Sequence, residues 1–421
     1  MKDIIKNLFK KIDYERVDFG FEIVFPDGDK FIYNNFPIAF RVIFKTDKAL
    51  KDFISRGSMG FLERYMNQDI DIEGDFFYVA HLGLLVEQQG LEPNLIEKIK
   101  IMYHFLTNRN TLKGSKKNIS HHYDLGNDFY SLWLDKNMQY TCAFFKTPED
   151  TLEQAQIQKM DLVCRKLQLK PGDFVVEAGC GWGGFAIYAV KNYGVKMRSF
   201  NISKEQIAYA KEWQKREGIS EKQLEFILDD YRTIRNDSCI YDKFVSIGML
   251  EHVGPENYEN LFDLIYKKIK PKGLALVHSI SRAYPRMQDP WVNKYIFPGG
   301  YIPSLGEIVV PLENMIKKNK KPQYLFIMDI ENLKYHYALT LDHWSKRFED
   351  NITTIREKYG ESFVRMFRVY LRGSSSAFRK GELTLLQILL KKELNPEYPL
   401  TREHFILSKE STLTTKFSSE V

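Results

Sequence analysis

The sequence predicts an α/β protein in which a doubly wound, Rossmann-like sheet follows a smaller α+β domain. Three observations support this fold class. The chain has 421 residues, which is more than one ordinary hydrophobic core accommodates. From about residue 160, strand and helix patterns alternate, as is typical of a parallel doubly wound sheet. The first hundred residues instead combine a hairpin pattern with helical spacing.

The N-terminal domain is expected over 1–105. Residues 19–35 alternate apolar and polar side chains around the turn PDGD, which predicts a β-hairpin, and 40–46 continues as a strand. Apolar spacing predicts helices over 49–67, 76–88 and 94–106. The polar, basic stretch 106–120 is predicted to be a linker.

The second domain is expected over 121–421. Its predicted strands share a buried, apolar pattern and cover 173–178, 195–202, 224–230, 242–249 and 274–281. Its predicted helices lie between these strands and cover 185–193, 204–218 and 257–273, the last one ending in glycine. An aromatic, proline-rich segment over 289–305 follows, and then helices. The first of these carries an apolar face formed by Tyr337, Leu341, Trp344 and Phe348.

Composition narrows the class of protein. No apolar run is long enough to cross a bilayer, and the start lacks a signal-peptide pattern, so a cytoplasmic protein is expected. Four cysteines without a paired spacing, Cys142, Cys164, Cys180 and Cys239, argue against disulfides and structural zinc. The net charge of +6 includes local basic clusters that favour an anionic membrane surface. The sequence has no basic stripe with interleaved aromatic residues, so nucleic acid is not predicted as a partner.

A glycine-rich turn, EAGCGWGG at 177–184, follows the first strand of the second domain and opens a helix. Glycines allow a ligand close to the backbone, and a helix N-terminus favours a carboxylate or phosphate. A site for NAD would need an acidic residue at the end of the second strand, but that strand ends in Asn201. The pattern instead resembles motif I of methyltransferases that use S-adenosylmethionine.

Most of the chain resembles the family of cyclopropane-fatty-acyl-phospholipid synthases and mycolic acid cyclopropane synthases. The segments that carry the resemblance are HHYDLGNDFY (121–130), NMQYTCAFF (137–145), EAGCGWGGFAIYA (177–189), ISKEQ (202–206), VSIGMLEHVGPENY (245–258), LVHSI (276–280) and DPWVNKYIFPGGYIPS (289–304). The resemblance implies a catalytic methyltransferase domain over 121–421 and a sterol-carrier-like lipid-binding domain over 1–105.

The resemblance also implies where S-adenosylmethionine binds. The cofactor lies on Gly179 and Gly181, and Tyr140 and Thr141 close on it from an earlier loop. The ribose and methionine portions meet Asn201, Ile202 and Gln206, where many relatives have threonine in place of Asn201. Tyr231 and Ile247 correspond to the walls of the adenine pocket. Taken alone, Gln206 reads equally well as a surface residue of a helix.

A bicarbonate ion in the active site is the second cofactor implied by the resemblance. Its ligands correspond to Cys142, Glu251, His278, the backbone of Ile280, and Tyr337. Taken singly, these residues fit ordinary core positions, with Cys142 as a small buried hydrophobe. The neighbouring His252 has no counterpart among these ligands. A zinc site made of cysteine, glutamate and histidine is the rival interpretation, but their spacing lacks a zinc signature, and no metal is expected.

The implied reaction explains why a base such as bicarbonate is needed. An isolated cis alkene is a weak nucleophile, so it requires the electrophilic methyl of a sulfonium, and methyl transfer leaves a carbocation. Ring closure then needs a base beside the new methyl, because water would trap the cation. Glu251 is either protonated or accepts a hydrogen from bicarbonate, and we favour the second. Cys142 is expected to bind the anion and not to act as a nucleophile. Tyr140 and Phe297 are candidates to stabilise the cation.

The resemblance further implies phospholipids with unsaturated acyl chains as substrates, contact with the inner face of the membrane, and a homodimer. The stretch 4–12, IIKNLFKKI, is amphipathic and basic, which fits either surface contact or packing on its own domain. Two alternatives remain. Related enzymes give methyl-branched or methylene fatty acids, and a vestigial methyltransferase domain would leave a non-catalytic lipid-binding protein.

Overall fold

A computed structural model describes residues 1–12, 17–88, 125–318, 324–393 and 398–406. The chain forms two compact units. The first contains Met1–His122, Arg286–Gly300 and Tyr337–Leu383; the second contains Tyr123–Pro285, Tyr301–His336 and Thr384–Val421. Two segments that we expected in the catalytic domain therefore belong to the first unit by their contacts. The predicted linker 106–120 and helix 94–106 lie outside the described residues, and the predicted domain limits stay a prediction.

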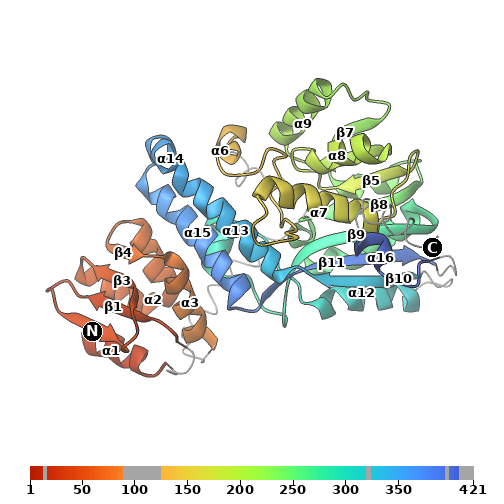
Figure 1. Ribbon diagram of the computed structural model, residues 1–421. Helices are drawn as coiled ribbons and strands as arrows, with labels where there is room; N and C mark the ends of the chain where they lie inside the picture. Colours follow the sequence, from red (N-terminus) through yellow and green to blue (C-terminus); the bar gives the residue numbers. More distant parts are fainter. Residues whose placement is uncertain (13–16, 89–124, 319–323, 394–397, 407–421) are drawn as a thin grey trace, which may run out of the picture. The chain divides into compact units, whose positions relative to one another are not determined.

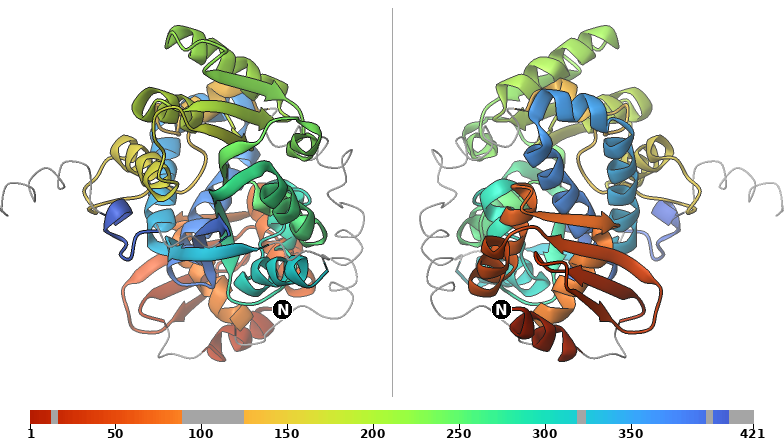
Figure 2. Two further views of the ribbon diagram at one scale, coloured as in Figure 1. Left: turned by 90° about the vertical axis from the view of Figure 1, so that its right-hand side faces the viewer. Right: turned by 90° about the vertical axis from the view of Figure 1, so that its left-hand side faces the viewer.

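The first unit contains a four-stranded sheet in the order β2-β1-β3-β4, visible in red to orange in the right-hand view of Figure 2. The strands are β1 (Gly20–Val24), β2 (Lys30–Tyr33), β3 (Ile38–Phe44) and β4 (Ile70–Gly74). β1 and β2 pair antiparallel, which confirms the hairpin predicted around PDGD. β1 and β3 pair parallel, and β3 and β4 antiparallel.

Helices complete the first unit. They are α1 (Lys2–Lys10), α2 (Asp47–Met66), α3 (Phe76–Gln88), α11 (Pro290–Tyr295), α14 (Ile352–Tyr359) and α15 (Glu361–Arg379), together with most of α13 (Lys334–Asp350). The α1 helix buries Ile5 and Phe9, and the Phe9 ring lies 5.2 Å from that of Phe21. Its Lys2 and Lys6 pair with Asp27 and Asp29. Of the two interpretations of 4–12, packing on its own domain describes α1 in this structure.

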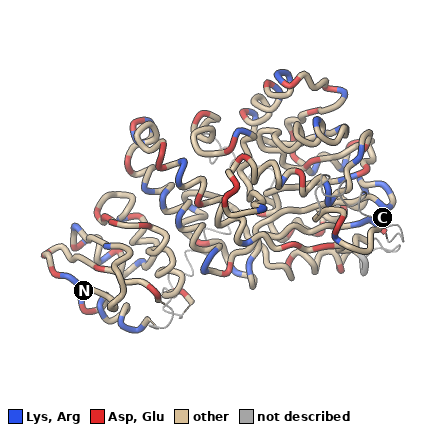
Figure 3. The backbone as a smooth tube through the Cα atoms, viewed as in Figure 1, with Lys and Arg blue, Asp and Glu red and all other residues tan. Residues whose placement is uncertain are grey.

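Arginines of α15 connect this late helix to the N-terminal sheet within the first unit. Arg365 donates to the carbonyl oxygens of Tyr65 and Ile70 at 3.0 and 2.9 Å, and forms an ion pair with Asp71. Arg372 forms a bidentate ion pair with Asp75. Figure 3 shows acidic and basic residues mixed along these helices. Such bidentate and multiple contacts explain why residues far apart in the sequence form one unit.

The second unit is built on a seven-stranded sheet in the order β10-β11-β9-β8-β5-β6-β7. The strands are β5 (Phe174–Ala178), β6 (Lys196–Asn201), β7 (Leu224–Leu228), β8 (Tyr241–Ile247), β9 (Ile269–Arg282), β10 (Leu325–Asn332) and β11 (Leu383–Lys392). The pairs from β7 through β9 are parallel, and strand order reverses between β5 and β8. This confirms the predicted doubly wound sheet and places its ligand-binding crevice at the carboxyl ends of β5 and β8.

Helices cover both faces of this sheet (Figure 1). α7 (Leu152–Lys166), α8 (Gly184–Tyr193) and α9 (Lys204–Arg216) enclose one apolar core with the sheet. α10 (Tyr258–Lys268) and α12 (Leu305–Lys318) enclose the other. α7 begins with a capping box formed by Thr151 and Gln154, which satisfies the first backbone donors of the helix. Short elements are α6 (Asn127–Ser131), α16 (Glu403–Ile406), η2 (Tyr231–Asn236), η3 (Leu250–His252) and η4 (Pro255–Asn257).

Two predictions about the second unit were wrong. The helix expected over 257–273 ends at Lys268, and its terminal glycine lies inside β9. A Cβ on Gly273 would lie 2.8 Å from the carbonyl oxygen of Lys270, so glycine is required there by a close backbone approach. We also expected only helices after residue 305, whereas β10 and β11 pair antiparallel at the end of the sheet.

Among the described residues, no helix combines the length and apolar character that a bilayer crossing requires.

Candidate active site

The glycine turn joins β5 to α8 at the carboxyl end of the sheet. Gly179, Gly181 and Gly183 have φ of 83°, 51° and 85°, a region that favours glycine. The amides of Gly179 and Cys180 both donate to the carbonyl oxygen of Phe200, the penultimate residue of β6, at 3.0 Å. A Cβ on Gly181 would meet no atom within 4 Å. The turn therefore presents open backbone at Gly181, where a bound cofactor can approach closely.

Asn201 and Gln206 meet beside this turn. The Asn201 Nδ2 donates to the carbonyl oxygen of Gly181 at 3.1 Å and to Gln206 Oε1 at 2.8 Å. Gln206 is only 4% exposed, which excludes the interpretation as a surface residue. Ser203 caps α9 by accepting a hydrogen bond from the Gln206 amide. These residues bring two side-chain amides to the edge of the glycine turn, where they suit recognition of hydroxyl groups.

A buried lysine of α7 holds the loop that contains Tyr140, Thr141 and Cys142. Lys159 of α7 is fully buried, and its Nζ donates to Gln139 Oε1 at 2.5 Å and to Thr141 Oγ1 at 3.0 Å. Gln156, one turn earlier, donates to the carbonyl oxygen of Thr141 at 2.8 Å. The loop is thus positioned by hydrogen bonds from α7, which the sequence analysis did not predict.

Aromatic rings connect this loop to the glycine turn. The Tyr140 ring lies 5.3 Å from that of Trp133 and 5.5 Å from that of Tyr130. The Tyr130 ring in turn lies 4.9 Å from that of Trp182, in the middle of the turn. Trp182 Nε1 donates to Asn127 Oδ1 of α6 at 2.7 Å. A chain of ring contacts thus links Tyr140 to the glycine turn, and the role of Tyr140 in cofactor binding stays a prediction.

Two titratable side chains, Lys159 and Glu177, are buried in this part of the site. Burial lowers the pKa of Lys159 to about 8, although the nearby Asp135 carboxyl acts in the opposite direction. Burial raises the pKa of Glu177 to about 7, against the stabilising hydrogen bond that its carboxylate accepts from Ser199 Oγ at 2.8 Å. Glu177 is the first residue of the glycine motif, and here it supports the turn from the core side of β5.

Glu251 lies four residues beyond the end of β8, in η3. Its Oε1 accepts a hydrogen bond from the backbone amide of Ile280 on β9 at 2.6 Å. Its Oε2 is buried and has no hydrogen-bond partner among the described residues. Burial raises the pKa of Glu251 to about 7. The amide of Ile280, which we predicted to face an anion, donates to Glu251 in this structure.

His278 lies on β9 opposite Ile247, the last residue of β8. Its ring is 1% exposed, and Nδ1 lies 3.1 Å from Nε2 of Gln387 on the neighbouring strand β11. Its Nε2 is buried without a partner in the part of the chain that the structure describes. Burial, together with positive Lys159 and Lys166, holds the pKa of His278 well below its ordinary value. The imidazole is therefore neutral near pH 7.

Cys142 is fully buried, and its Sγ lies 3.2 Å from the carbonyl oxygen of Ala143 and 3.9 Å from that of Leu333. Such contacts suit a protonated thiol. The charge of Lys159 contributes to the lowered pKa of His278, and Cys142 in turn affects the pKa of Lys159. The loop, α7 and β9 thus place these three groups in one neighbourhood of the second unit.

The remaining predicted residues are placed as follows. Ile202 follows β6, Tyr231 begins η2, and Ile247 is buried at the end of β8. Tyr337 belongs to the first unit, where its ring lies 4.5 Å from that of Phe378 and 6.0 Å from that of Trp344. Phe297 also belongs to the first unit, with its ring 5.7 Å from that of Tyr370.

His252 follows Glu251 in η3, and burial lowers its pKa to about 4. Within the described ranges, no three His, Cys, Asp or Glu side chains form a group suited to a metal ion. The sequence analysis missed Lys159 and Gln387. Gln387 is a polar residue within the apolar run LLQILL, and this mismatch was the available signal, whereas α7 buries several polar residues besides Lys159 and offered no such signal.

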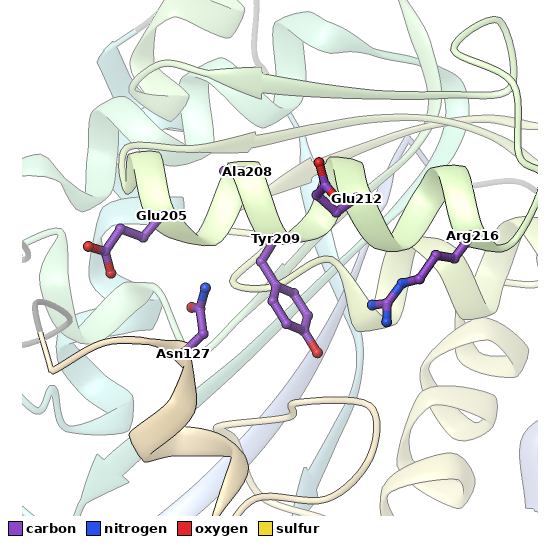
Figure 4. Close-up of a pocket in the computed structure, with 6 residues that line it drawn as sticks. All are labelled: Asn127, Glu205, Ala208, Tyr209, Glu212 and Arg216. Carbon is purple, nitrogen blue, oxygen red and sulfur yellow. The ribbon is translucent and has the colours of Figure 1, made fainter.

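A shallow hollow of about 520 Å³ lies on the outer side of α9 (Figure 4). It is lined by Asn127, Glu205, Ala208, Tyr209, Glu212 and Arg216. Tyr209 and Arg216 project from α9 toward the side on which Asn127 lies. None of the predicted cofactor or anion ligands lines this hollow. Its mixed charges are solvent-exposed, so it lacks the convergent buried polar groups that characterise a catalytic site.

The profile of the family described as mycolic acid cyclopropane synthetase matches residues 110–388. A family described as a domain of unknown function matches residues 4–82. The cyclopropane-fatty-acyl-phospholipid synthase of Escherichia coli (strain K12) is 37% identical over 350 residues, which are 83% of this chain and 87% of the relative.

Two further proteins are similar to the chain. A probable fatty acid methyltransferase of Pseudomonas putida is 38% identical over 294 residues, covering 68% of this chain and 72% of the relative. The crystal structure of the mycolic acid cyclopropane synthase CmaA1, complexed with SAH and CTAB, aligns with a TM-score of 0.59 and 30% identity. That alignment covers 66% of this chain and 98% of the solved one.

Proposed function

Because the chain belongs to the mycolic acid cyclopropane synthetase family and is a methyltransferase that uses S-adenosylmethionine, we propose that it is a cyclopropane-fatty-acyl-phospholipid synthase. Its reaction adds a methylene to the cis double bond of an unsaturated acyl chain in a membrane phospholipid. The observation that carries this proposal is a pair of buried atoms, Glu251 Oε2 and His278 Nε2, that have no partner among the described residues beside the cofactor turn.

The residues around the glycine turn fit S-adenosylmethionine. When bound, this cofactor supplies an electrophilic methyl group on a sulfonium. Gly181 offers open backbone, Gly179 is the other proposed contact of the turn, and Asn201 and Gln206 offer amides for the ribose and methionine portions. No acidic residue stands at the tip of β6, so hydroxyl recognition by this chain rests on those amides.

The buried residues around Glu251 fit a small oxyanion such as bicarbonate. When bound, bicarbonate supplies an oxygen base for the proton that is lost on ring closure. A neutral His278 with a proton on Nε2 donates a hydrogen bond to that oxyanion. Glu251, with its pKa near 7, accepts a hydrogen from the same ligand when ionised. Cys142 of the same unit is another proposed ligand, and Tyr337, which belongs to the first unit, is proposed as a ligand from the family resemblance alone.

The chain's own task is to hold the alkene in place and exclude water. When one carbon of the double bond accepts the methyl, the other carbon becomes a carbocation, which water would convert to an alcohol. Burial of His278 and Cys142 keeps this part of the site dry. Tyr140, held by Trp133 and Tyr130, presents an aromatic ring near the cofactor turn that can stabilise positive charge.

A second candidate product is favoured by the similarity to the probable fatty acid methyltransferase. In that case the cation would lose a different proton, and the product would keep a double bond, as a methyl-branched unsaturated or a methylene fatty acid. We further propose that the region 1–105 binds lipid and that the protein contacts the anionic inner face of the membrane as a homodimer. Support for the lipid, membrane and dimer proposals comes from the family resemblance alone.

The test is an assay on liposomes of a cis-unsaturated phospholipid with S-adenosylmethionine, with and without added bicarbonate. A cyclopropane product adds one methylene to the acyl chain and resists cleavage at the former double bond. A product of the same mass that is still cleaved there supports the branching alternative. Absence of any heavier chain, with S-adenosylmethionine binding intact, contradicts both. The His278→Gln variant serves as the inactive control.

A further inference from the structure

The Gln387 side chain is a buried polar group that neither the glycine turn nor the proposed anion ligands account for. It lies on β11 within the apolar run LLQILL and is fully buried. Its Nε2 lies 3.1 Å from His278 Nδ1 on the neighbouring strand β9. An amide buried at this cost, in a strand of leucines and isoleucine, indicates a specific task for its hydrogen bond.

The direction of this hydrogen bond fixes the state of the imidazole. The nitrogen of an amide group can only donate, so Nδ1 of His278 accepts and carries no proton. An imidazolium would place one N–H against another, and burial with Lys159 and Lys166 already holds the pKa of His278 well below its ordinary value. In a neutral ring the single proton then resides on Nε2.

We propose that Gln387 is a positioning residue, which holds His278 as the tautomer protonated on Nε2 and orients that N–H toward the reacting oxyanion. The tautomer follows from the hydrogen bond alone, whereas its use in the reaction rests on the proposed function. His278 Nε2 is buried and has no hydrogen-bond partner among the residues that the structure describes. An N–H at this nitrogen would therefore be costly unless an acceptor binds there.

The experiment uses the full-length protein with ¹⁵N-labelled histidine. NMR of the ring nitrogens distinguishes the two neutral tautomers, and the signal of His278 is identified by its absence in His278→Gln. The sequence contains nine histidines, so this assignment step is required. Spectra are recorded for the wild type and for Gln387→Glu, which keeps the side-chain shape but can only accept a hydrogen bond when ionised.

A matched control addresses the cost of burying a carboxylate. Gln214 of α9 is 4% exposed in the same unit, and its Nε2 donates to the carbonyl oxygen of Leu224 at 2.7 Å. Gln214→Glu therefore loses a comparable buried amide donor without touching His278. We expect it to unfold at lower temperature while the His278 spectrum and the turnover per folded molecule stay unchanged.

In the wild type we expect the proton on Nε2. In Gln387→Glu we expect it on Nδ1, with kcat reduced on the order of a hundredfold or more and KM for S-adenosylmethionine unchanged. Gln387→Met, which keeps the volume but forms no hydrogen bond to the ring, should give mixed tautomers and a loss of about tenfold. If Gln387→Glu does not fold, Gln387→Met replaces it in both measurements.

A proton on Nδ1 in the wild type would overturn the proposal. So would a Gln387→Glu protein with wild-type kcat, or a Gln387→Met protein with the unchanged tautomer when only that variant folds. The outcome remains distinct from that of the proposed function. If the wild type yields no cyclopropane but its tautomer depends on Gln387, the function fails and the tautomer assignment stands.

Discussion

The two halves of the candidate site are built in different ways. The cofactor half, with Gly179, Gly181, Asn201 and Gln206, comes from one continuous β5–α8–β6–α9 stretch. The anion half takes Glu251 from beyond β8, His278 from β9 and Gln387 from β11. The first half needs only local strand–turn–helix geometry, whereas the second forms only when distant strands pair. A substitution in one half should therefore leave the other half intact.

Glu251→Gln should disable the anion half and leave the cofactor half intact. We expect cyclopropane formation to fall on the order of 10²–10³-fold, because an acceptor for the oxyanion's hydrogen is lost. Calorimetric affinity for S-adenosylmethionine should stay unchanged. Because the pKa of Glu251 is about 7, wild-type turnover should rise as pH increases through that value. An equal loss of cofactor affinity would show that the halves are not independent.

Glu177→Gln should change the pH dependence of stability beneath the cofactor half. The folded pKa of about 7 exceeds the ordinary value of 4.5, so this carboxyl contributes stability below pH 4.5 that is lost as pH rises through 7. The difference is at most on the order of 3 kcal/mol. Denaturant unfolding from pH 4.5 to 8 should show a flatter profile for the variant, whereas a profile parallel to the wild type would contradict the buried, protonated state.

Gly184→Ala should disturb the contact between the glycine turn and the loop before it. An added Cβ would lie 2.3 Å from the carbonyl oxygen of Asn137 and 2.4 Å from Gln139 Nε2. We expect a loss of about 1–3 kcal/mol in the free energy of unfolding and weaker cofactor binding. The control is Gly83→Ala in α3, where a Cβ meets no atom within 4 Å and helix propensity should increase stability. Equal melting shifts in both variants would refute the contact.

Asn201→Ala should have the smallest effect of the four. It removes the hydrogen bonds to Gly181 and Gln206, each worth about 1 kcal/mol, so affinity for S-adenosylmethionine should fall about fivefold to tenfold. Asn192→Ala is the matched control, because that exposed side chain only caps the carbonyl oxygen of Tyr188. If both variants bind the cofactor like the wild type, Asn201 has no part in the cofactor half.

The sequence by itself determined the doubly wound sheet, the N-terminal hairpin and the glycine turn. Each depends on patterns within about thirty residues, where apolar period, glycines and turn residues act locally. The sequence also placed Asn201 at the end of the second strand and Gln206 in the helix that follows, and the family resemblance assigned both to the cofactor. It did not show that Gln206 is buried, because an amphipathic helix pattern does not reveal which neighbour covers a polar residue.

Only the tertiary structure decided what surrounds the anion half. The pairing of β11 beside β9 brings Gln387 to His278, and we expected no strand there. Lys159, which the sequence analysis did not single out, is turned inward by α7 to Thr141. The hydrogen bond from the Ile280 amide to Glu251 likewise joins residues that are far apart in the sequence. A buried polar group is stable only with its partner, and that partner can lie anywhere in the sequence, so local patterns contain no record of it.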